Sequence, residues 1–468
     1  MASSPDTSSL DRDTRSIIVL NRFGLGARPG DREAVARDPV GALRAEIDDP
    51  ATPLMDGATL LTGRAAYRSE YLTQKALRAA RERPAPVMID GMAPLRPPES
   101  PAGPTYQAEV EARFASACAA PVGFVERLVA FWSNHFAISA DKGGQVKVMA
   151  GAYEREAIRP HVLGRFQDML DAVSKHPAML LYLDNNVSAG PKSAFGQRSG
   201  RGLNENLARE ILELHTLGVD GGYGQADVTA FANILTGWTV RSGDKAPDEA
   251  LGRFAFEAGR HEPGDHEVLG RRYGQAGLAQ GEGVLADIAR HPATARHIAR
   301  KLAAHMVSDT PPPDLVARLE TRFRETDGDL RALAQVLIEA PDCWQMKAQK
   351  MRSPWDWMVA MARGAGTRPP TQLLLRSLRA LGHGPWEVPA PKGYPDDTAN
   401  WLSPDGLDTR LDIANEFGRG LVLDDPPARA LDLLGPRLDA QTRQAVMRAE
   451  SRPQAFALLV LSPPFLWR

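Results

Sequence analysis

Apolar residues recur at intervals of three and four positions through most of this sequence, while runs that alternate apolar and polar residues are few. Such spacing places apolar side chains on one face of an α-helix. The pattern is clearest at 66–82, 122–136, 205–217, 283–306, 314–324, 329–339, 371–381 and 441–460. Gly218, Gly328 and Pro341 stand where such helices are expected to end.

This pattern predicts an all-α protein, a large multi-helix single domain with roughly twelve to sixteen helices and long irregular loops. At most one small β-hairpin is expected. Its strands would lie at 253–257 and 266–269.

The composition is that of a globular protein. Of the 468 residues, 43 % are hydrophobic and 24 % are charged, which supports a large core and excludes wholesale disorder. The formal net charge is −2, so the chain has no overall basic field, and nucleic acid is not expected as its main partner. No window approaches the roughly 18 consecutive apolar residues of a membrane span, so no transmembrane segment is expected. Cys118 and Cys343 belong to no Cys or His cluster, which argues against a disulfide framework or a thiolate zinc site.

Three segments lack helical spacing. Residues 83–104 are rich in proline and are predicted to form an extended arm or a linker. Residues 184–202 and 385–408 are irregular and polar, as functional loops and mobile surface loops both are. We predict a disordered N-terminus at 1–12, followed by one helical domain at 13–468 that contains the proline-rich segment.

The first residues carry acidic side chains where a signal peptide has basic ones, and the first apolar run, at 17–20, is short. No export signal is therefore recognised. The expected location is the cytoplasm, with loss of a leader or export together with a partner as alternatives.

The densest group of polar side chains lies in the predicted helix at 204–217. Asn204 is a suitable N-cap, and Glu205 follows in the first turn, where the helix dipole favours a carboxylate. An apolar seam runs between the polar stripes of this helix. The helix is therefore expected to be buried between others.

The polar residues of this helix point in different directions. At about 100° per residue, Asn206, Glu210 and Glu213 lie on one stripe, and His215 leaves the helix about 160° from Glu213. A di-iron helix needs Glu-x-x-His spacing so that both ligands face one metal, and the spacing here is Glu-x-His. The geometry disfavours a di-iron site, and at most one of Glu210 and His215 is expected to face any given cavity.

A second polar group, Asn134 and His135, is set among aromatic residues at 131–136. A single histidine in such surroundings is more often a hydrogen-bonded core residue than a ligand, and it would gain functional meaning by converging on Glu210 or His215. For the helix at 204–217, three interpretations stay open: an interior network that fixes helix packing, a ligand-binding or catalytic site, and a solvated face.

Several stretches resemble, in order, the motifs of one protein family. They are 22–26 (RFGLG), 131–136 (FWSNHF), 182–185 (YLDN), 204–223 (NENLAREILELHTLGVDGGY), 227–228 (DV), 235–238 (LTGW), 291–296 (HPATAR) and 301–302 (KL). The resemblance is to the bacterial domain-of-unknown-function family numbered 1800, and it covers nearly the whole chain. It implies one mainly helical family domain and no particular activity.

Members of that family are often exported. Their genes often neighbour those of a second uncharacterised family, numbered 1501, whose members commonly carry twin-arginine signals. The resemblance thus implies a protein from the family numbered 1501 as a partner. Two positions depart from the family's usual pattern: Tyr394 stands where Trp is usual, and His383 stands where Gln is usual.

The first functional hypothesis is an enzyme that hydrolyses or oxidises an envelope-derived or polymer-derived substrate. Its carboxylates and imidazoles would act as general base and acid, or would hold a divalent metal ion through oxygen ligands and one nitrogen ligand. The expected catalytic residues are Glu210, Glu213, His215 and His135. The expected substrate-binding residues are Asp184, Asn204, Glu205, Asn206, Arg209 and Trp238. The sequence assigns no individual metal ligand.

The alternative is a non-enzymatic binding or assembly partner of a neighbouring exported protein, with a contact surface supplied by 84–104 and 385–408. A third hypothesis is a structural helical protein whose motifs only stabilise the fold. The direction of the polar stripe Asn206/Glu210/Glu213 separates these hypotheses, because a site requires that these side chains turn inward.

Overall fold

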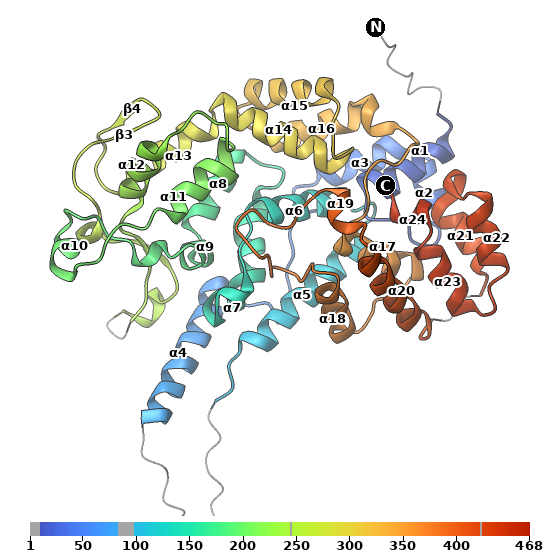
Figure 1. Cartoon of the computed structure of the whole chain (residues 1–468), viewed down its shortest axis with the longest axis horizontal. Coiled ribbons are helices and arrows are strands. Elements are labelled where there is room, and N and C mark those ends of the chain that lie inside the picture. Colours follow the sequence, from blue (N-terminus) through green and yellow to red (C-terminus); the bar gives the residue numbers. More distant parts are fainter. Residues whose placement is uncertain (1–9, 83–97, 244–245, 422–423) are drawn as a thin grey trace, which may run out of the picture.

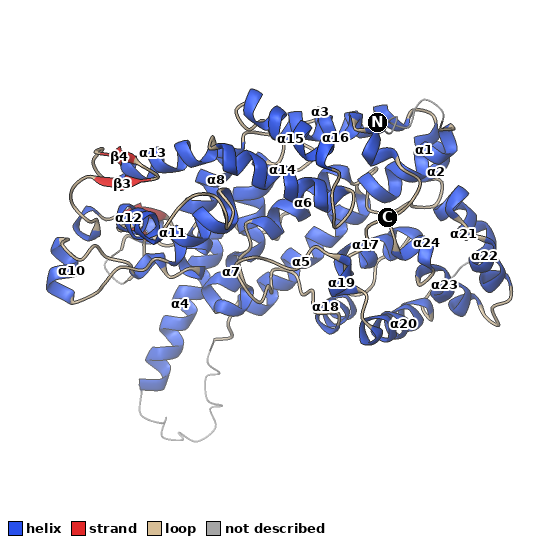
Figure 2. Cartoon of the chain, turned by 45° about the horizontal axis from the view of Figure 1, so that its top comes forward, coloured by secondary structure: helices blue, strands red, loops and turns tan. Residues whose placement is uncertain are grey.

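Helices form nearly all of the structure (Figure 2). The computed structural model describes residues 10–82, 98–243, 246–421 and 424–468. The first α-helices are α1 (Arg12–Ile18), α2 (Asp31–Ala36), α3 (Pro39–Asp48), α4 (Gly63–Glu82), α5 (Ala102–Ala119), α6 (Phe124–His135) and α7 (Gly144–Tyr153). Those of the middle are α8 (Phe166–Lys175), α9 (Pro177–Tyr182), α10 (Ala194–Ser199), α11 (Asn206–Glu210), α12 (Gln225–Leu235), α13 (Leu278–Ala289), α14 (Pro292–Met306), α15 (Pro313–Glu325) and α16 (Leu330–Glu339). The last are α17 (Pro354–Ala365), α18 (Thr371–Ala380), α19 (Thr398–Trp401), α20 (Pro404–Gly418), α21 (Pro426–Leu434), α22 (Ala440–Met447), α23 (Arg452–Val460) and α24 (Pro463–Leu466).

Short 3₁₀ turns connect many of these helices. They are η3 (Ala140–Lys142), η5 (Arg159–His161), η6 (Asn185–Val187), η8 (Asp248–Ala250), η9 (Ala258–Arg260), η10 (Pro341–Trp344) and η11 (Gly435–Arg437). The body is elongated, with α1 to α3 beside α21 to α24 at one end and α8 to α13 at the other, and α4 stands out from it (Figure 1). The prediction of an all-α fold is confirmed.

The strands form two small antiparallel pairs in place of the single hairpin that the sequence predicts. The pairs are β1 (Trp238–Val240) with β2 (Phe254–Phe256), and β3 (His266–Val268) with β4 (Arg271–Tyr273). The two predicted stretches, 253–257 and 266–269, do contain strands. Each pairs with a different neighbour, so they are not two halves of one hairpin.

The predicted helix ends are confirmed. Gly218 and Gly328 have φ of 83° and 76°, a left-handed conformation that glycine adopts without a side-chain clash. Helix α16 ends at Glu339, two residues before Pro341. Helices therefore end at these residues in the structure, as the sequence predicts.

Two predicted helical stretches are each divided into two helices. The stretch 283–306 divides into α13 and α14, because the His291 side chain caps α14 and Pro292 takes its first position. The stretch 441–460 divides into α22 and α23, and Ser451 caps the second helix. The described chain holds 24 α-helices, more than predicted, partly because α10 and α19 lie in segments expected to be irregular.

Three helices continue into π-helical turns. These turns are η2 (Val19–Phe23) after α1, η4 (Glu154–Ile158) after α7, and η7 (Ile211–Thr216) after α11. In a π-turn an N–H donates to the carbonyl five residues earlier, as Leu217 does to Leu212 at 3.0 Å. The angle predicted between Glu213 and His215 assumes an α-helix, so it does not apply within η7.

Helices α6 and α17 form part of the buried core. Helix α17 is buried continuously from Pro354 to Gly364. Ser353 caps it, because its Oγ accepts a hydrogen bond from the N–H of Asp356 at 3.2 Å. The carboxylate of Asp356 then pairs with Arg127 of α6 at 2.7 Å. This buried ion pair holds the start of α17 beside α6.

Parts of the predicted irregular segments lie outside the described residues, namely 1–9 and 83–97. Within the predicted disordered N-terminus, the structure places Asp11 as the cap of α1, accepting from the N–H of Thr14 at 2.6 Å. That helix begins at Arg12, so the prediction of disorder through residue 12 is wrong at its end, because Asp11 is an effective N-cap.

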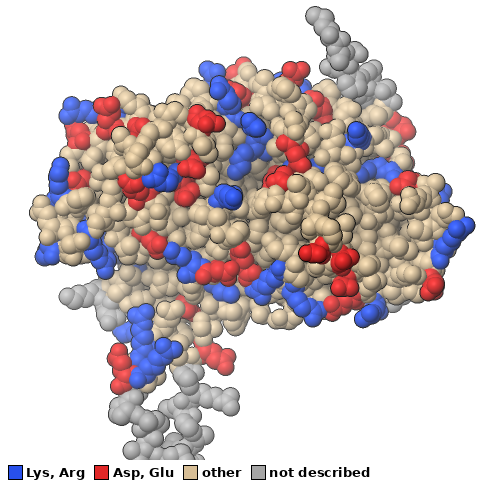
Figure 3. Space-filling view, viewed as in Figure 1, with Lys and Arg blue, Asp and Glu red and all other residues tan. Residues whose placement is uncertain are grey.

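The surface carries charges of both signs. Figure 3 shows basic and acidic side chains interspersed over one face of the molecule. Among the helices of the described stretches, none combines the length and the apolar character that crossing a membrane requires.

Candidate functional site

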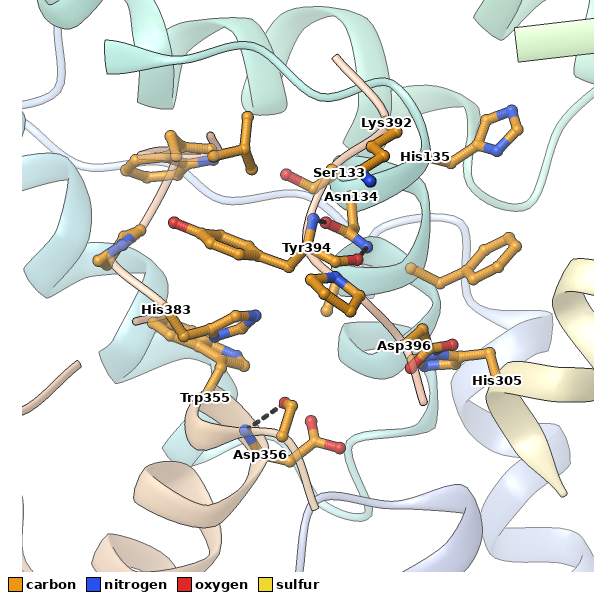
Figure 4. Close-up of a pocket in the computed structure, with 18 of the residues that line it drawn as sticks. Ser133, Asn134, His135, His305, Trp355, Asp356, His383, Lys392, Tyr394 and Asp396 are labelled. Atoms are coloured by element: carbon orange, nitrogen blue, oxygen red, sulfur yellow. Dashed lines mark hydrogen bonds and ion pairs between the residues drawn. The ribbon is translucent and has the colours of Figure 1, made fainter. Parts of the chain in front are cut away.

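A cavity of about 450 Å³ lies between α6, α14, the start of α17 and the segment 383–400 (Figure 4). Helix α6 contributes Phe131, Ser133, Asn134 and His135, and α14 contributes Lys301 and His305. The start of α17 contributes Ser353, Trp355 and Asp356, and the segment contributes His383, Trp386, Lys392, Tyr394 and Asp396. The cavity therefore gathers titratable side chains from four parts of the chain.

The Asn134 side chain holds the irregular segment against α6. Its Oδ1 accepts from the N–H of Tyr394 at 2.7 Å, and its Nδ2 donates to the Tyr394 carbonyl at 3.0 Å. The preceding residue, Gly393, has φ of 78°, and a Cβ there would lie 2.4 Å from the Asn134 carbonyl oxygen. Only glycine fits this approach, so local backbone contacts fix a wall of the cavity that has no regular secondary structure.

His305 and Asp396 form a hydrogen-bonded pair at the cavity. The His305 Nδ1 lies 3.0 Å from the Asp396 Oδ2. Burial lowers the pKa of His305 below its ordinary value, although the charge of Asp396 opposes this shift. Burial alone would raise the pKa of Asp396, but the charges of His305 and Lys350 hold it well below its ordinary value. Near neutral pH, Asp396 is thus a carboxylate beside a neutral imidazole.

This pairing fixes the tautomer of His305. The neutral ring donates its Nδ1–H to Asp396, so its Nε2 carries a lone pair. Among the described residues the buried Nε2 has no hydrogen-bond partner. An imidazole oriented by a carboxylate, with a free nitrogen, is the arrangement that general-base catalysis uses.

Asp356 and His383 line another part of the cavity (Figure 4). Burial alone would raise the pKa of Asp356, but Arg127 and Arg468 hold it far below its ordinary value. Burial lowers the pKa of His383 to about 3, so this imidazole is neutral. Its ring centroid lies 4.3 Å from that of Tyr394.

Aromatic rings form a further wall. The Arg113 guanidinium lies over Trp355 and Trp386, 4.5 Å and 5.0 Å from their ring centroids. Arg113 also pairs with the buried Glu154 at 2.9 Å, and Trp386 donates its Nε1–H to the same carboxylate at 3.2 Å. These contacts keep the two tryptophans in place, and the carboxylate of Glu154 balances the positive charge of Arg113.

A cluster of basic residues lies behind the His135 side of the cavity. Lys301 donates from Nζ to the Nδ1 of His135 at 3.0 Å, and His135 Nε2 lies 3.0 Å from the carbonyl oxygen of His215. His297 is close by, with its ring centroid 6.1 Å from that of His135. Burial lowers the pKa of His135, His215 and His297, the last two to about 3 and about 4. All three imidazoles are therefore neutral at pH 7.

Burial also lowers the pKa of Lys301 from 10.5 to about 8. Within the described part of the chain, no carboxylate lies within ion-pair distance of its ammonium group. One of its three protons is bound by His135, and its other two have no acceptor among the described residues.

The structure brings only part of the predicted site to this cavity. His135 lines it, and His215 lies behind His135 with a ring centroid distance of 6.2 Å, so these two predicted residues do converge. Neither ring nitrogen of His215 has a hydrogen-bond partner among the described residues.

The polar stripe of the predicted helix lies elsewhere, nearer the surface. Asn206 is exposed, and Glu210 and Glu213 are half-buried and do not line the cavity. Burial and the charge of Glu213 raise the pKa of Glu210. Glu213 accepts a hydrogen bond of 3.4 Å from Tyr223. The catalytic assignment of Glu210 and Glu213 stays a prediction.

Glu205 and Arg209 form a surface network with α12. They pair at 2.8 Å, and Glu205 also accepts from Thr229 at 2.6 Å and from Gln225 at 2.9 Å. These hydrogen bonds, that from Thr229 above all, lower the pKa of Glu205. The pattern is that of a helix-packing contact.

The remaining predicted binding residues are dispersed. Asp184 pairs with Lys142 at 2.6 Å on the surface. Asn204 Nδ2 donates to the Asp184 carbonyl at 3.1 Å, and its Oδ1 accepts from the N–H of Asn206 at 2.9 Å. The N-cap of α11 is Glu205, so the predicted cap at Asn204 is wrong by one residue, because the helix starts one position later. Trp238 is fully buried. None of these three side chains lines the cavity.

No group of three or more His, Cys, Asp or Glu side chains placed to hold a metal ion is found within residues 10–82, 98–243, 246–421 and 424–468. Among the described residues, the structure therefore identifies no set of ligands for the divalent metal ion that the sequence analysis suggested.

A family model described as "Protein of unknown function (DUF1800)" matches residues 18–467 of the chain. The chain belongs to this family. The resemblance stated from the sequence motifs is thus confirmed over nearly the whole length. No curated protein and no solved structure matches the chain.

The sequence analysis missed His305, Asp396 and the role of Lys301. Lys301 does lie in one of the family-like motifs, and His383 and Tyr394, the two departures from the family pattern, are neighbours in the cavity. The 301–302 motif and the two departures from the family pattern were therefore the sequence features that could have indicated this cavity. No spacing rule could join them, because 166 positions separate His135 from Lys301.

Proposed function

We propose that the cavity is the active site of a hydrolase, in which His305 acts as the general base. The observation that carries this proposal is the His305–Asp396 pair: both residues line the cavity, and Nε2 of His305 has no hydrogen-bond partner among the described residues. Hydrolysis needs only a water nucleophile and groups that move protons. Both requirements fit the residues that line this space.

In this mechanism, Nε2 of His305 removes a proton from water as the water oxygen attacks the substrate. Asp396 keeps the ring in the required tautomer and stabilises the imidazolium that forms. The remaining protons of Lys301 can stabilise negative charge that develops on the substrate, and one of them can pass to the leaving group. His305 then returns its proton to solvent, and Lys301 takes up a proton from solvent, so both residues regain their starting states.

The dimensions and the lining suggest the kind of substrate. A cavity of about 450 Å³ fits a small molecule or one unit of a polymer. Trp355, Trp386 and Tyr394 offer flat apolar faces between polar groups. We propose a small fragment of an envelope or other polymer as the substrate.

The test is turnover of a panel of chromogenic esters, amides and glycosides by the wild-type protein and by H305Q and D396N. General-base catalysis contributes about 10²–10⁴-fold, so both variants should lose activity by that factor on any substrate that the wild type hydrolyses. H161Q is the matched control, because His161 is partly exposed and lies outside the cavity. Wild-type rates in H305Q and D396N, or a panel without any turnover, would contradict the proposal.

The second candidate is the non-enzymatic binding partner, and α4 favours it. This helix stands out from the body in both views (Figures 1 and 2), and its second half exposes Leu72, Ala76 and Ala79. The partner would be a protein of the family numbered 1501. Co-purification with such a protein, lost on L72E and kept in the matched variant L431E at another exposed leucine, would support this function. Equal recovery of both variants would contradict it.

A further inference from the structure

The charges in the cavity do not cancel. Asp356 is already paired with Arg127 at 2.7 Å and with Arg468 at 3.3 Å. Asp396 is paired with His305 at 3.0 Å and lies 3.7 Å from Lys350. These carboxylates are therefore already paired, and although the charge of Asp396 raises the pKa of Lys301, burial outweighs this effect.

Two lysines that line the cavity have no such partner among the described residues. Lys301 has only the neutral His135 as a hydrogen-bond acceptor, at 3.0 Å. Lys392 is exposed at the wall and makes no ion pair. Asp397 also lines the cavity, but its carboxylate accepts hydrogen bonds from the Asn400 side chain and caps α19.

The two lysines lie on the same side of the cavity. Lys301 contacts His135, the last residue of α6, and Figure 4 shows Lys392 beside Ser133, Asn134 and His135. Ammonium groups without a counter-ion favour a charged oxygen acceptor, since charge-assisted hydrogen bonds are about twice as strong as neutral ones.

We propose that this side of the cavity, defined by Lys301 and Lys392, binds an anionic group of the substrate, a carboxylate or a phosphate. This inference rests on the proposed function in taking the cavity as the substrate site. It adds that the substrate is an anion, and that the anionic group lies next to α6.

Sulfate and malonate are the probes, as permanently charged stand-ins for phosphate and carboxylate groups, with chloride at matched ionic strength as the reference. Calorimetric titration should show saturable binding of at least one probe to the wild-type protein. K301M and K392M should each weaken it by about 10-fold or more, because each removes a charge-assisted hydrogen bond. K192M is the control, since Lys192 is exposed and lies outside the cavity.

Preference for sulfate or for malonate separates the two kinds of anionic group. The pH dependence provides a second readout. Burial lowers the pKa of Lys301 to about 8, so affinity should fall above pH 8 in the wild type and not in K301M. The groups that face Lys301 do not titrate in that range, because the pKa values of His135, His215, His297 and Asp396 are all lowered.

Failure of this inference and failure of the hydrolase proposal give different results. If H305Q abolishes turnover while neither anion binds the wild type, the anionic substrate is refuted and the hydrolase remains. If anions bind and depend on both lysines while no substrate is turned over, the anion site stands and the hydrolase is refuted. Equal anion affinities in the wild type, K301M and K392M would overturn the inference outright.

Discussion

Lys301→Met is expected to stabilise the protein at neutral pH. The substitution keeps an unbranched side chain and removes an ammonium group that burial has deprived of water. Its only hydrogen-bond partner among the described residues is His135, and the charge of Asp396, beyond ion-pair distance, offsets the burial only in part. A buried charge without a counter-ion destabilises the folded state. The same lysine is proposed to bind substrate, so the site would be maintained at a cost in stability.

The size of the effect follows from the pKa. In the unfolded chain Lys301 releases its proton near 10.5, and in the folded protein it does so near 8. Between these values the unfolded state binds more protons, so the unfolding free energy of the wild type rises with pH relative to K301M. At 1.36 kcal/mol per unit, the rise between about pH 7 and about pH 10 is about 2.5 kcal/mol.

At pH 7 the full penalty is present, because the lysine is charged in both states. It is offset by about 1 kcal/mol for the hydrogen bond to His135, which the variant lacks. K301M should therefore be more stable than the wild type by about 2 kcal/mol at pH 7. By pH 10 this advantage should be gone.

Urea unfolding followed by tryptophan fluorescence, at a series of pH values between these limits, measures the difference directly. Other titrating groups are common to both proteins and cancel in the comparison. K192M should show no pH-dependent difference from the wild type. A K301M difference that does not vary with pH, or a variant less stable than the wild type at pH 7, would refute the reasoning.

Two further predictions concern the cavity wall and the base. G393A should lower the unfolding free energy by about 2–4 kcal/mol and abolish activity, because a Cβ would meet the Asn134 carbonyl at 2.4 Å. G382A is the control, since Gly382 also has positive φ but a Cβ there would meet no atom within 4 Å; it should lower the unfolding free energy by only about 1 kcal/mol and keep activity. Equal losses in the two variants would contradict this account. In a pH profile of kcat/KM, the acid limb should lie below pH 6.5, because burial lowers the pKa of His305, and the basic limb should lie near pH 8 and disappear in K301M. An acid limb above pH 6.5 would exclude His305 as the base.

The fold was predictable to the extent that local patterns determine it. Helical spacing and the glycines at 218 and 328 located the helices and their ends. The division between α13 and α14 at Pro292 could have been predicted, since a proline preceded by a capping side chain favours the start of a helix. The π-turn after Glu210 was not, because α and π turns share the same residue preferences and the choice depends on tertiary packing.

Of the predicted site residues, His135 alone lines the cavity in the described part of the chain. Its partners come from α14 and from the segment 383–400, which has no periodicity to indicate where its side chains point. The position of that segment depends on the Asn134 side chain and on Gly393, two contacts that exist only in the folded chain. Asp396 therefore meets His305 through tertiary structure, across 91 positions of sequence.

Because Ile211–Thr216 forms a π-turn, the structure constrains the number of residues in this segment as well as their identity. A chain shorter by one residue could close the same turn as an ordinary α-turn, and the backbone groups within the turn would then change place. The carbonyl of His215 would then leave the Nε2 of His135, 3.0 Å away, and Lys301 would lose its oriented acceptor. In this chain, the contact therefore depends on the number of residues in the turn: a deletion or an insertion there is expected to break it.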